Sequence, residues 1–92
     1  MKSNLITMIV DEHCEKCEEV KRAVTKSLSD NGITAKIRFI KYDTDEAVDL
    51  AIVHNLSQVP SMVVNGVGFA GFPNEIVFLV ALGKKSGFGK KS

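Results

Sequence analysis

The residues best suited to chemistry are two cysteines three positions apart, Cys14 and Cys17. Thiols at positions i and i+3 lie on one side of a helix when the first stands at or just before the first turn, close enough to form a disulfide. Unpaired N–H groups and a partial positive charge at a helix start stabilise a thiolate and lower the pKa of the leading cysteine below about 8.5. We therefore expect a reactive dithiol.

Two neighbouring side chains bear on the charge at this dithiol. Lys16 lies between the cysteines and favours a thiolate. His13 precedes Cys14 and is a candidate base or positive charge beside it, although a solvated loop residue is the simpler interpretation. The acidic groups of the same few turns oppose a thiolate: Asp11, Glu12, Glu15 and Glu18.

The segments on either side of the motif predict how it is held. Residues 5–10 are short, apolar and rich in β-branched side chains, which is typical of a central strand buried on both faces. After Cys17, apolar residues recur at intervals of three and four up to Leu28, and Asn31-Gly32 then predicts a helix end. A strand should thus lead directly into a helix that begins at the dithiol.

The middle of the chain continues this alternation of strand and helix. Apolar and polar residues alternate over residues 33–39, which predicts a second strand. Residues 43–46 offer N-cap candidates for a short second helix, with Asp43 and Glu46 as a capping box, and that helix should end near Asn55.

The last third predicts a hairpin and a third helix. Residues 61–64 and 67–70 are apolar and flank Asn65-Gly66, a strong signal for a tight turn. Pro73 suits the first position of a helix, which Gly83 should end.

These elements predict an α/β fold of order β-α-β-α-β-β-α, with a four-stranded mixed sheet and helices on both faces. Residues 1–83 form one domain in this interpretation. Residues 84–92, rich in lysine and glycine, are expected to be a flexible tail.

The composition of the chain limits the cellular location and the classes of binding partner that we expect. The chain has 92 residues, of which 45% are hydrophobic, enough for one core without a structural disulfide. The net charge of +1 hides a tail of +4 and a body, residues 1–83, of −3, so nucleic acid is not an expected partner. The start of the chain lacks a long apolar segment after basic residues. We expect a cytoplasmic monomer that does not bind a membrane.

Three features together resemble the glutaredoxin and thioredoxin-like superfamily in its minimal form, over residues 5–83. They are the dithiol between strand and helix, Val59-Pro60 before the hairpin, and Gly71-Phe72 before the last helix. The resemblance implies a thioredoxin-like fold and a thiol–disulfide oxidoreductase acting on protein or small-molecule disulfides. It also implies no bound cofactor, and glutathione or a thioredoxin-reductase-type enzyme as the electron donor.

The resemblance further implies where substrate binds. Pro60 would be cis and face the dithiol, which leaves the backbone of Val59 free to pair with an extended substrate. The expected catalytic residues are Cys14 and Cys17. The expected substrate-binding residues are Val59, Pro60, Gly71, Phe72, Lys16 and His13.

The chain also differs from the familiar branches of this superfamily. Thioredoxins usually carry Gly-Pro between the cysteines and glutaredoxins Pro-Tyr, whereas this chain carries Glu15-Lys16. Thioredoxins place a buried acid six residues before the first cysteine, and here that residue is Met8. A reaction that uses Cys17 therefore needs another proton acceptor.

Metal binding is the alternative function. Structural zinc needs four ligands, and besides the thiols the chain has only two histidines, His13 and His54, which are 41 positions apart. Copper-carrying ferredoxin-like domains also place Cys-x-x-Cys between a first strand and a first helix, but their order is β-α-β-β-α-β. A third alternative is an iron–sulfur carrier whose cluster bridges two protomers with glutathione.

Overall fold

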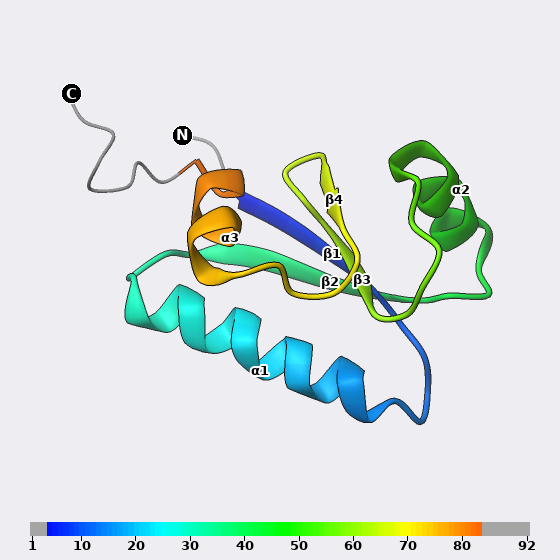
Figure 1. The fold of residues 1–92 in the computed structure, drawn as a ribbon, viewed down its shortest axis with the longest axis horizontal. Coiled ribbons are helices and arrows are strands. Elements are labelled where there is room, and N and C mark those ends of the chain that lie inside the picture. Colours follow the sequence, from blue (N-terminus) through cyan, green and yellow to red (C-terminus); the bar gives the residue numbers. More distant parts are fainter. Residues whose placement is uncertain (1–3, 84–92) are drawn as a thin grey trace.

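Seven elements follow one another in the expected order in a computed structural model, which describes residues 4–83 (Figure 1). The strands are β1 (Asn4–Val10), β2 (Ala35–Lys41), β3 (Ser61–Val64) and β4 (Val67–Phe69). The helices are α1 (Glu15–Asp30), α2 (Asp45–His54) and α3 (Glu75–Ala81). The tail expected over 84–92 lies outside the described residues.

The strands form one mixed sheet in the order β2-β1-β3-β4. β1 pairs with β2 in parallel and with β3 antiparallel, while β3 and β4 form the expected hairpin. β1 is central because it is apolar almost throughout: Ile6 and Met8 are fully buried, and Thr7 and Ile9 are 5% and 3% exposed. The predicted α/β architecture is confirmed.

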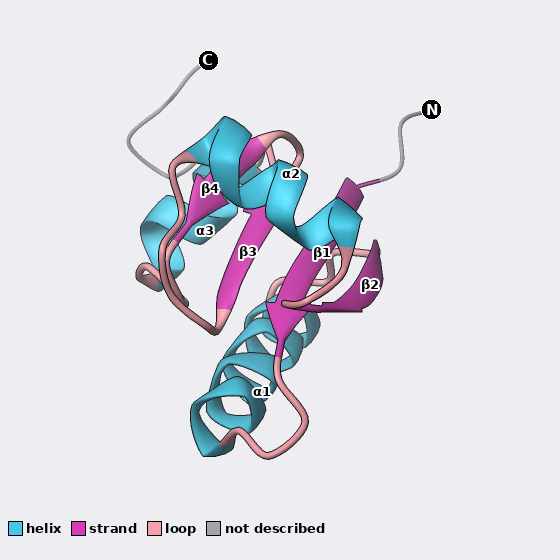
Figure 2. Ribbon diagram, turned by 90° about the vertical axis from the view of Figure 1, so that its right-hand side faces the viewer, coloured by secondary structure: helices cyan, strands magenta, loops and turns pink. Residues whose placement is uncertain are grey.

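Helices cover both faces of this sheet, with α1 and α3 on one face and α2 on the other (Figures 1 and 2). The main core lies under α1 and α3, where the apolar spacing of α1 meets the inward side chains of β1 and β3. Its buried members are Ile6, Met8, Val20, Val24, Leu28, Met62, Val64, Phe78 and Leu82.

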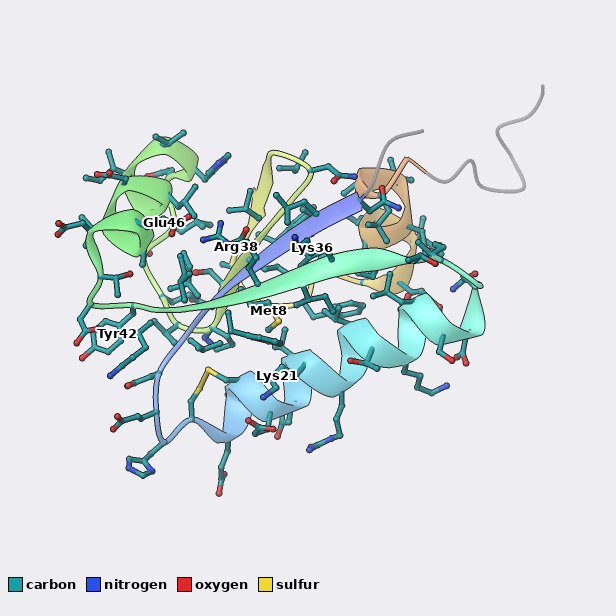
Figure 3. The ribbon with its side chains drawn as sticks, turned by 180° about the vertical axis from the view of Figure 1, so that it is seen from behind. Met8, Lys21, Lys36, Arg38, Tyr42 and Glu46 are labelled. Carbon is teal, nitrogen blue, oxygen red and sulfur yellow. A yellow bond between two sulfur atoms is a disulfide. The ribbon has the colours of Figure 1, made fainter. Side chains whose placement is uncertain are left out.

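Fewer side chains of α2 than of α1 are buried against the sheet. Ala47 is the buried residue of this helix. Arg38 of β2 donates to Glu46 at 2.8 Å, an exposed pair that ties helix to strand (Figure 3). His54, the last residue of α2, lies against Gly68 of β4 so closely that a Cβ added there would be 2.6 Å from the His54 Cβ. The glycine therefore permits this approach.

Local hydrogen bonds decide where the elements begin. Thr44, one of the expected N-cap candidates, caps α2, and its hydroxyl accepts from the N–H of Ala47 at 3.3 Å. The capping box expected for Asp43 and Glu46 is not formed, because Glu46 accepts from Arg38 instead.

Two other elements begin, and one ends, at a residue that differs from the predicted one. Pro73 precedes α3 instead of opening it, because Asn74 is the cap and accepts from Val77 N–H at 2.9 Å. The second strand begins at Ala35 instead of Ile33, since the Ile33 N–H donates to the Leu28 carbonyl and closes the end of α1. The hairpin's second strand ends at Phe69, one residue before its predicted end.

Asn65 in the hairpin turn connects three elements. Its backbone is left-handed, with φ of 49°. Its Oδ1 accepts from the Leu5 N–H at 2.9 Å, and its Nδ2 donates to Asn4 Oδ1 at 3.0 Å and to the Ala81 carbonyl at 3.3 Å. The hairpin is thereby joined to the start of β1 and the end of α3.

Candidate active site

The dithiol stands where β1 leads into α1, as predicted, and the cysteines form a disulfide with a Cα–Cα distance of 5.2 Å (Figure 3). Cys14 is the N-cap residue of α1, and its sulfur accepts from the N–H of Cys17 at 3.0 Å. Cys14 is partly exposed, whereas Cys17 is 2% exposed because it belongs to the buried face of α1. Cys14 is therefore the more accessible of the two cysteines, and Cys17 is the covered one.

The surroundings of Cys17 offer no buried carboxylate. Met8 is fully buried at the β1 position where thioredoxins have an acid. Every Asp and Glu among residues 4–83 is exposed. A proton that leaves Cys17 must therefore pass to solvent or to a bound substrate.

The bond between Val59 and Pro60 is cis, as the resemblance implied. Pro60 is buried, while Val59 is 36% exposed. The hydroxyl of Ser61 donates to the Gln58 carbonyl at 2.9 Å and so holds the loop on both sides of this bond. Within the described part of the chain no hydrogen bond is made to the backbone N–H or C=O of Val59. Both groups are available to a ligand.

A groove of about 490 Å³ lies between the first turns of α1, the Pro60 loop and the turn before α3. It brings together five of the predicted substrate-binding residues: Lys16, Val59, Pro60, Gly71 and Phe72. The remaining lining residues are Glu19, Val20, Ala23, Gln58 and Ala70.

Gly71 and Phe72 shape one wall of this groove for different reasons. Gly71 has φ of +88°, a left-handed conformation that side chains disfavour. The Phe72 ring packs on the buried Phe78 ring with centroids 5.2 Å apart. The core thus fixes the position of the wall.

The structure does not bring His13 into the groove. Its side chain is 95% exposed, and its Nε2 lies 4.0 Å from a Glu12 carboxylate oxygen. The simpler interpretation, a solvated loop residue, agrees with this geometry. His54 packs against β4 under α2, away from the groove. No group of three or more potential metal ligands occurs among residues 4–83.

Sequence reasoning missed half of the groove. Glu19, Val20 and Ala23 follow Lys16 at helical spacing, so a helical projection would have placed all four on one side of α1. Gln58 and Ala70 carry no such signal, because their part in the groove depends on how two distant loops meet.

Comparison with known families gives one match. The family described as Thioredoxin domain matches residues 6–75, from β1 to the first residue of α3, which includes the dithiol and the Pro60 loop. No curated protein matched the chain. No helix of the described residues is long and apolar enough to cross a membrane.

Proposed function

Because the chain belongs to the thioredoxin-domain family, we propose that it is a dithiol oxidoreductase that reduces disulfides through Cys14 and Cys17. The observation that carries this proposal is the asymmetry of the pair. Cys14 is a partly exposed residue that caps α1 and whose sulfur accepts an N–H, whereas Cys17 is buried. An exposed nucleophile and a covered resolving thiol are what disulfide exchange needs.

The reaction begins with the reduced dithiol. The Cys14 thiolate attacks one sulfur of a substrate disulfide, and the other substrate sulfur leaves as a thiolate that takes up a proton. Cys17 loses its proton, attacks Cys14 and releases the second substrate thiol. Two electrons have passed to the substrate, and the protein holds its own disulfide. Two donor thiols, from glutathione or from the dithiol of a thioredoxin-reductase-type enzyme, reduce it again.

The first turn of α1 supports the attacking form of Cys14. The N–H of Cys17 already donates to the Cys14 sulfur in the disulfide, and the same N–H would stabilise a thiolate. Lys16 lies in the adjacent groove and adds a positive charge. Neither step requires a bound cofactor.

The groove supports a substrate that binds in an extended form. The N–H and C=O of Val59 have no hydrogen-bond partner within residues 4–83, so they can pair with one residue of such a segment, as in strand addition. The substrates we propose are protein or small-molecule disulfides. The rest of the proposal, a cytoplasmic monomer without nucleic-acid or membrane partners, rests on composition and on the acidic body of the chain.

The observed topology argues against a copper carrier. A helix separates β2 from β3 and the last described element is α3, so the order is not the β-α-β-β-α-β of the ferredoxin-like domains. An iron–sulfur carrier remains the alternative, and purified protein with bound iron and visible absorbance would favour it.

The direct test compares two single variants on a disulfide-containing protein substrate. We expect Cys17→Ser to accumulate a mixed disulfide through Cys14, seen as an added mass that a reductant removes, and Cys14→Ser to accumulate none. In the reduced wild type, iodoacetamide should alkylate Cys14 much faster than Cys17. Equal alkylation rates, or trapping by both variants, would contradict the assigned roles. Coupling turnover separately to glutathione with its reductase and to thioredoxin reductase identifies the donor.

A further inference from the structure

Two asparagines of the chain, Asn31 and Asn65, are followed by glycine, and each pair forms a turn. Such pairs are open to deamidation, because glycine has no side chain to hinder attack by its own backbone nitrogen. Hydroxide takes the proton of the glycine N–H, the nitrogen attacks the side-chain carbonyl carbon of asparagine, and the amide nitrogen leaves as ammonia with a proton from water. Water then opens the cyclic imide to aspartate or isoaspartate. Ammonia is thus exchanged for water, and solvent is the only reactant.

The two pairs differ at the nitrogen that attacks. The Gly32 N–H donates to the Ser29 carbonyl at 3.2 Å, where α1 ends. The Gly66 N–H makes no hydrogen bond to any residue within 4–83, and Gly66 itself is exposed. Solvent base can therefore reach the N–H of Gly66 directly, whereas that of Gly32 must first leave its carbonyl partner.

At Asn65 the side chain opposes the reaction. Its Oδ1 accepts from the Leu5 N–H at 2.9 Å, and its Nδ2 donates to Asn4 Oδ1 at 3.0 Å and to the Ala81 carbonyl at 3.3 Å. Ring closure turns this amide onto its own backbone, so all three bonds must break before Gly66 attacks. The bonds are exposed and each is weak, so they slow the reaction without preventing it.

At Asn31 both reacting groups are held. The Nδ2 of Asn31 donates to the Ser27 carbonyl at 2.8 Å and to Glu75 Oε2 at 3.2 Å, in addition to the bond of the Gly32 N–H. Asn31 is also partly buried, whereas Asn65 is exposed. Deamidation of Asn31 therefore requires a larger opening of the structure.

We propose that Asn65 is the residue at which the folded chain deamidates, at a rate set by the three hydrogen bonds of its side chain. Aspartate keeps an oxygen for the Leu5 N–H, but it places its second oxygen against Asn4 Oδ1 and the Ala81 carbonyl. Asn4 cannot turn its amide to donate without losing another bond, because its Nδ2 already donates to the Thr34 carbonyl at 3.2 Å. The modification thus releases the hairpin from β1 and α3. It involves neither the dithiol nor the groove, so it does not depend on the proposed function.

Peptide mapping by mass spectrometry measures deamidation of both pairs in one sample of the full chain, kept at slightly alkaline pH. Folded wild type is compared with wild type unfolded in guanidinium chloride. We expect folding to slow deamidation of Asn65 on the order of tenfold to a hundredfold, the factor for three exposed hydrogen bonds. Within the folded protein, Asn65 should react faster than Asn31.

Two substitutions of Asn4 test whether these bonds set the rate. Asn4→Ala removes an acceptor of Asn65 Nδ2, so it should speed deamidation of Asn65 roughly two- to tenfold and leave that of Asn31 unchanged. Asn4→Asp is the matched control, because it keeps an acceptor oxygen and loses the same donor to Thr34. In this control, Asn65 should react at the wild-type rate.

Four outcomes contradict the proposal. Equal rates at Asn65 in the folded and unfolded chain would mean that its hydrogen bonds give no protection. Equal effects of the two Asn4 substitutions would separate the rate from the bond to Asn65. Acceleration of Asn31 together with Asn65 in Asn4→Ala would show that the substitution unfolds the chain. Faster reaction of Asn31 than of Asn65 in folded wild type would identify the wrong site.

Asn65→Asp reproduces one product and tests its consequence. We expect this substitution to lower the thermal midpoint, while the reduced dithiol reacts with dithiobis(nitrobenzoate) at the wild-type rate. An unchanged midpoint would mean that the modification does not release the hairpin.

Discussion

Asn65 contributes to stability both through its backbone and through its side chain. Three hydrogen bonds of the side chain join the hairpin turn to Asn4, Leu5 and Ala81. They are exposed, so each is worth about 0.5–1 kcal/mol. The left-handed backbone is a separate requirement, and it disfavours residues other than glycine and asparagine.

Two substitutions at this position separate the two contributions. Asn65→Gly keeps the backbone conformation and loses the three side-chain bonds, which should lower the free energy of unfolding by about 1.5–3 kcal/mol. Asn65→Ala should lose about 1 kcal/mol more. Urea denaturation measures both. Asn55→Gly is the control, because Asn55 is also left-handed and its side chain makes no hydrogen bond to a described residue. An unchanged midpoint for Asn65→Gly would refute this role.

For single residues, the sequence predicted where each lies in the fold better than it predicted which distant residues each contacts. Cys14, Cys17 and the Asn65-Gly66 turn could be placed because each depends on a few adjacent residues. The bonds from Asn65 to Asn4 and Ala81 could not be predicted, since they join residues 61 and 16 positions apart.

The pair between Arg38 and Glu46 makes the attachment of α2 depend on pH. The hydrogen bond from Arg38 holds the pKa of Glu46 below its ordinary value. A carboxylate with a lowered folded-state pKa stabilises the fold above its unfolded pKa, and this contribution is lost as pH falls through the folded value. The pair is exposed, so the effect is small.

We expect Glu46→Gln to lower the thermal midpoint slightly at neutral pH and to have no effect in acid, once the pH is below the lowered folded-state pKa of Glu46 and the wild-type carboxyl is itself protonated. Thermal melts at the two pH values measure this. Asp49→Asn is the control variant, because Asp49 is an exposed carboxylate of the same helix that forms no ion pair with a described residue. A Glu46→Gln deficit that persists undiminished in acid would show that the side chain acts by packing instead.

The order and type of the elements were predictable because their apolar periodicities are clear, as in β1 and α1. The first and last residues of the elements were harder to predict. Residues 43–46 were all N-cap candidates for α2, and the structure selects Thr44 among them, while Glu46 bonds to Arg38. Pro73 was expected at the first position of α3, but Asn74 caps that helix and it begins two residues later.

The core and the substrate groove are coupled through one aromatic contact. Phe78 is fully buried, and its ring supports Phe72, which lines the groove. Phe78→Leu should lower the free energy of unfolding by about 1–2 kcal/mol. Because Phe72 would lose its support, we also expect slower reduction of peptide disulfides well below the melting temperature.

Val24→Ala is the control for this coupling. Val24 is also fully buried, but it lies outside the groove. The Val24→Ala substitution should lower the free energy of unfolding while leaving the rate of peptide reduction unchanged. Equal slowing in both variants would mean that the rate follows global stability and not the position of Phe72.

For the whole molecule the sequence predicted the mixed sheet with helices on both faces and the match to a redox family. It could not predict the groove between α1, the Pro60 loop and the turn before α3. The walls of this groove come from one helix and two loops, so its shape depends on where these elements meet rather than on any local pattern.

The contact between His54 and Gly68 constrains how this sequence can evolve. Because the nearest atom to a new Cβ at position 68 is the Cβ of His54, Gly68→Ala requires α2 to move, and His54→Ala would not relieve the clash. Only glycine at position 54 removes the opposing atom. We expect Gly68→Ala to lower the thermal midpoint, His54→Ala to leave that loss unchanged in the double variant, and His54→Gly to recover part of it. In relatives, a side chain at position 68 should accompany glycine at position 54 or a displaced second helix.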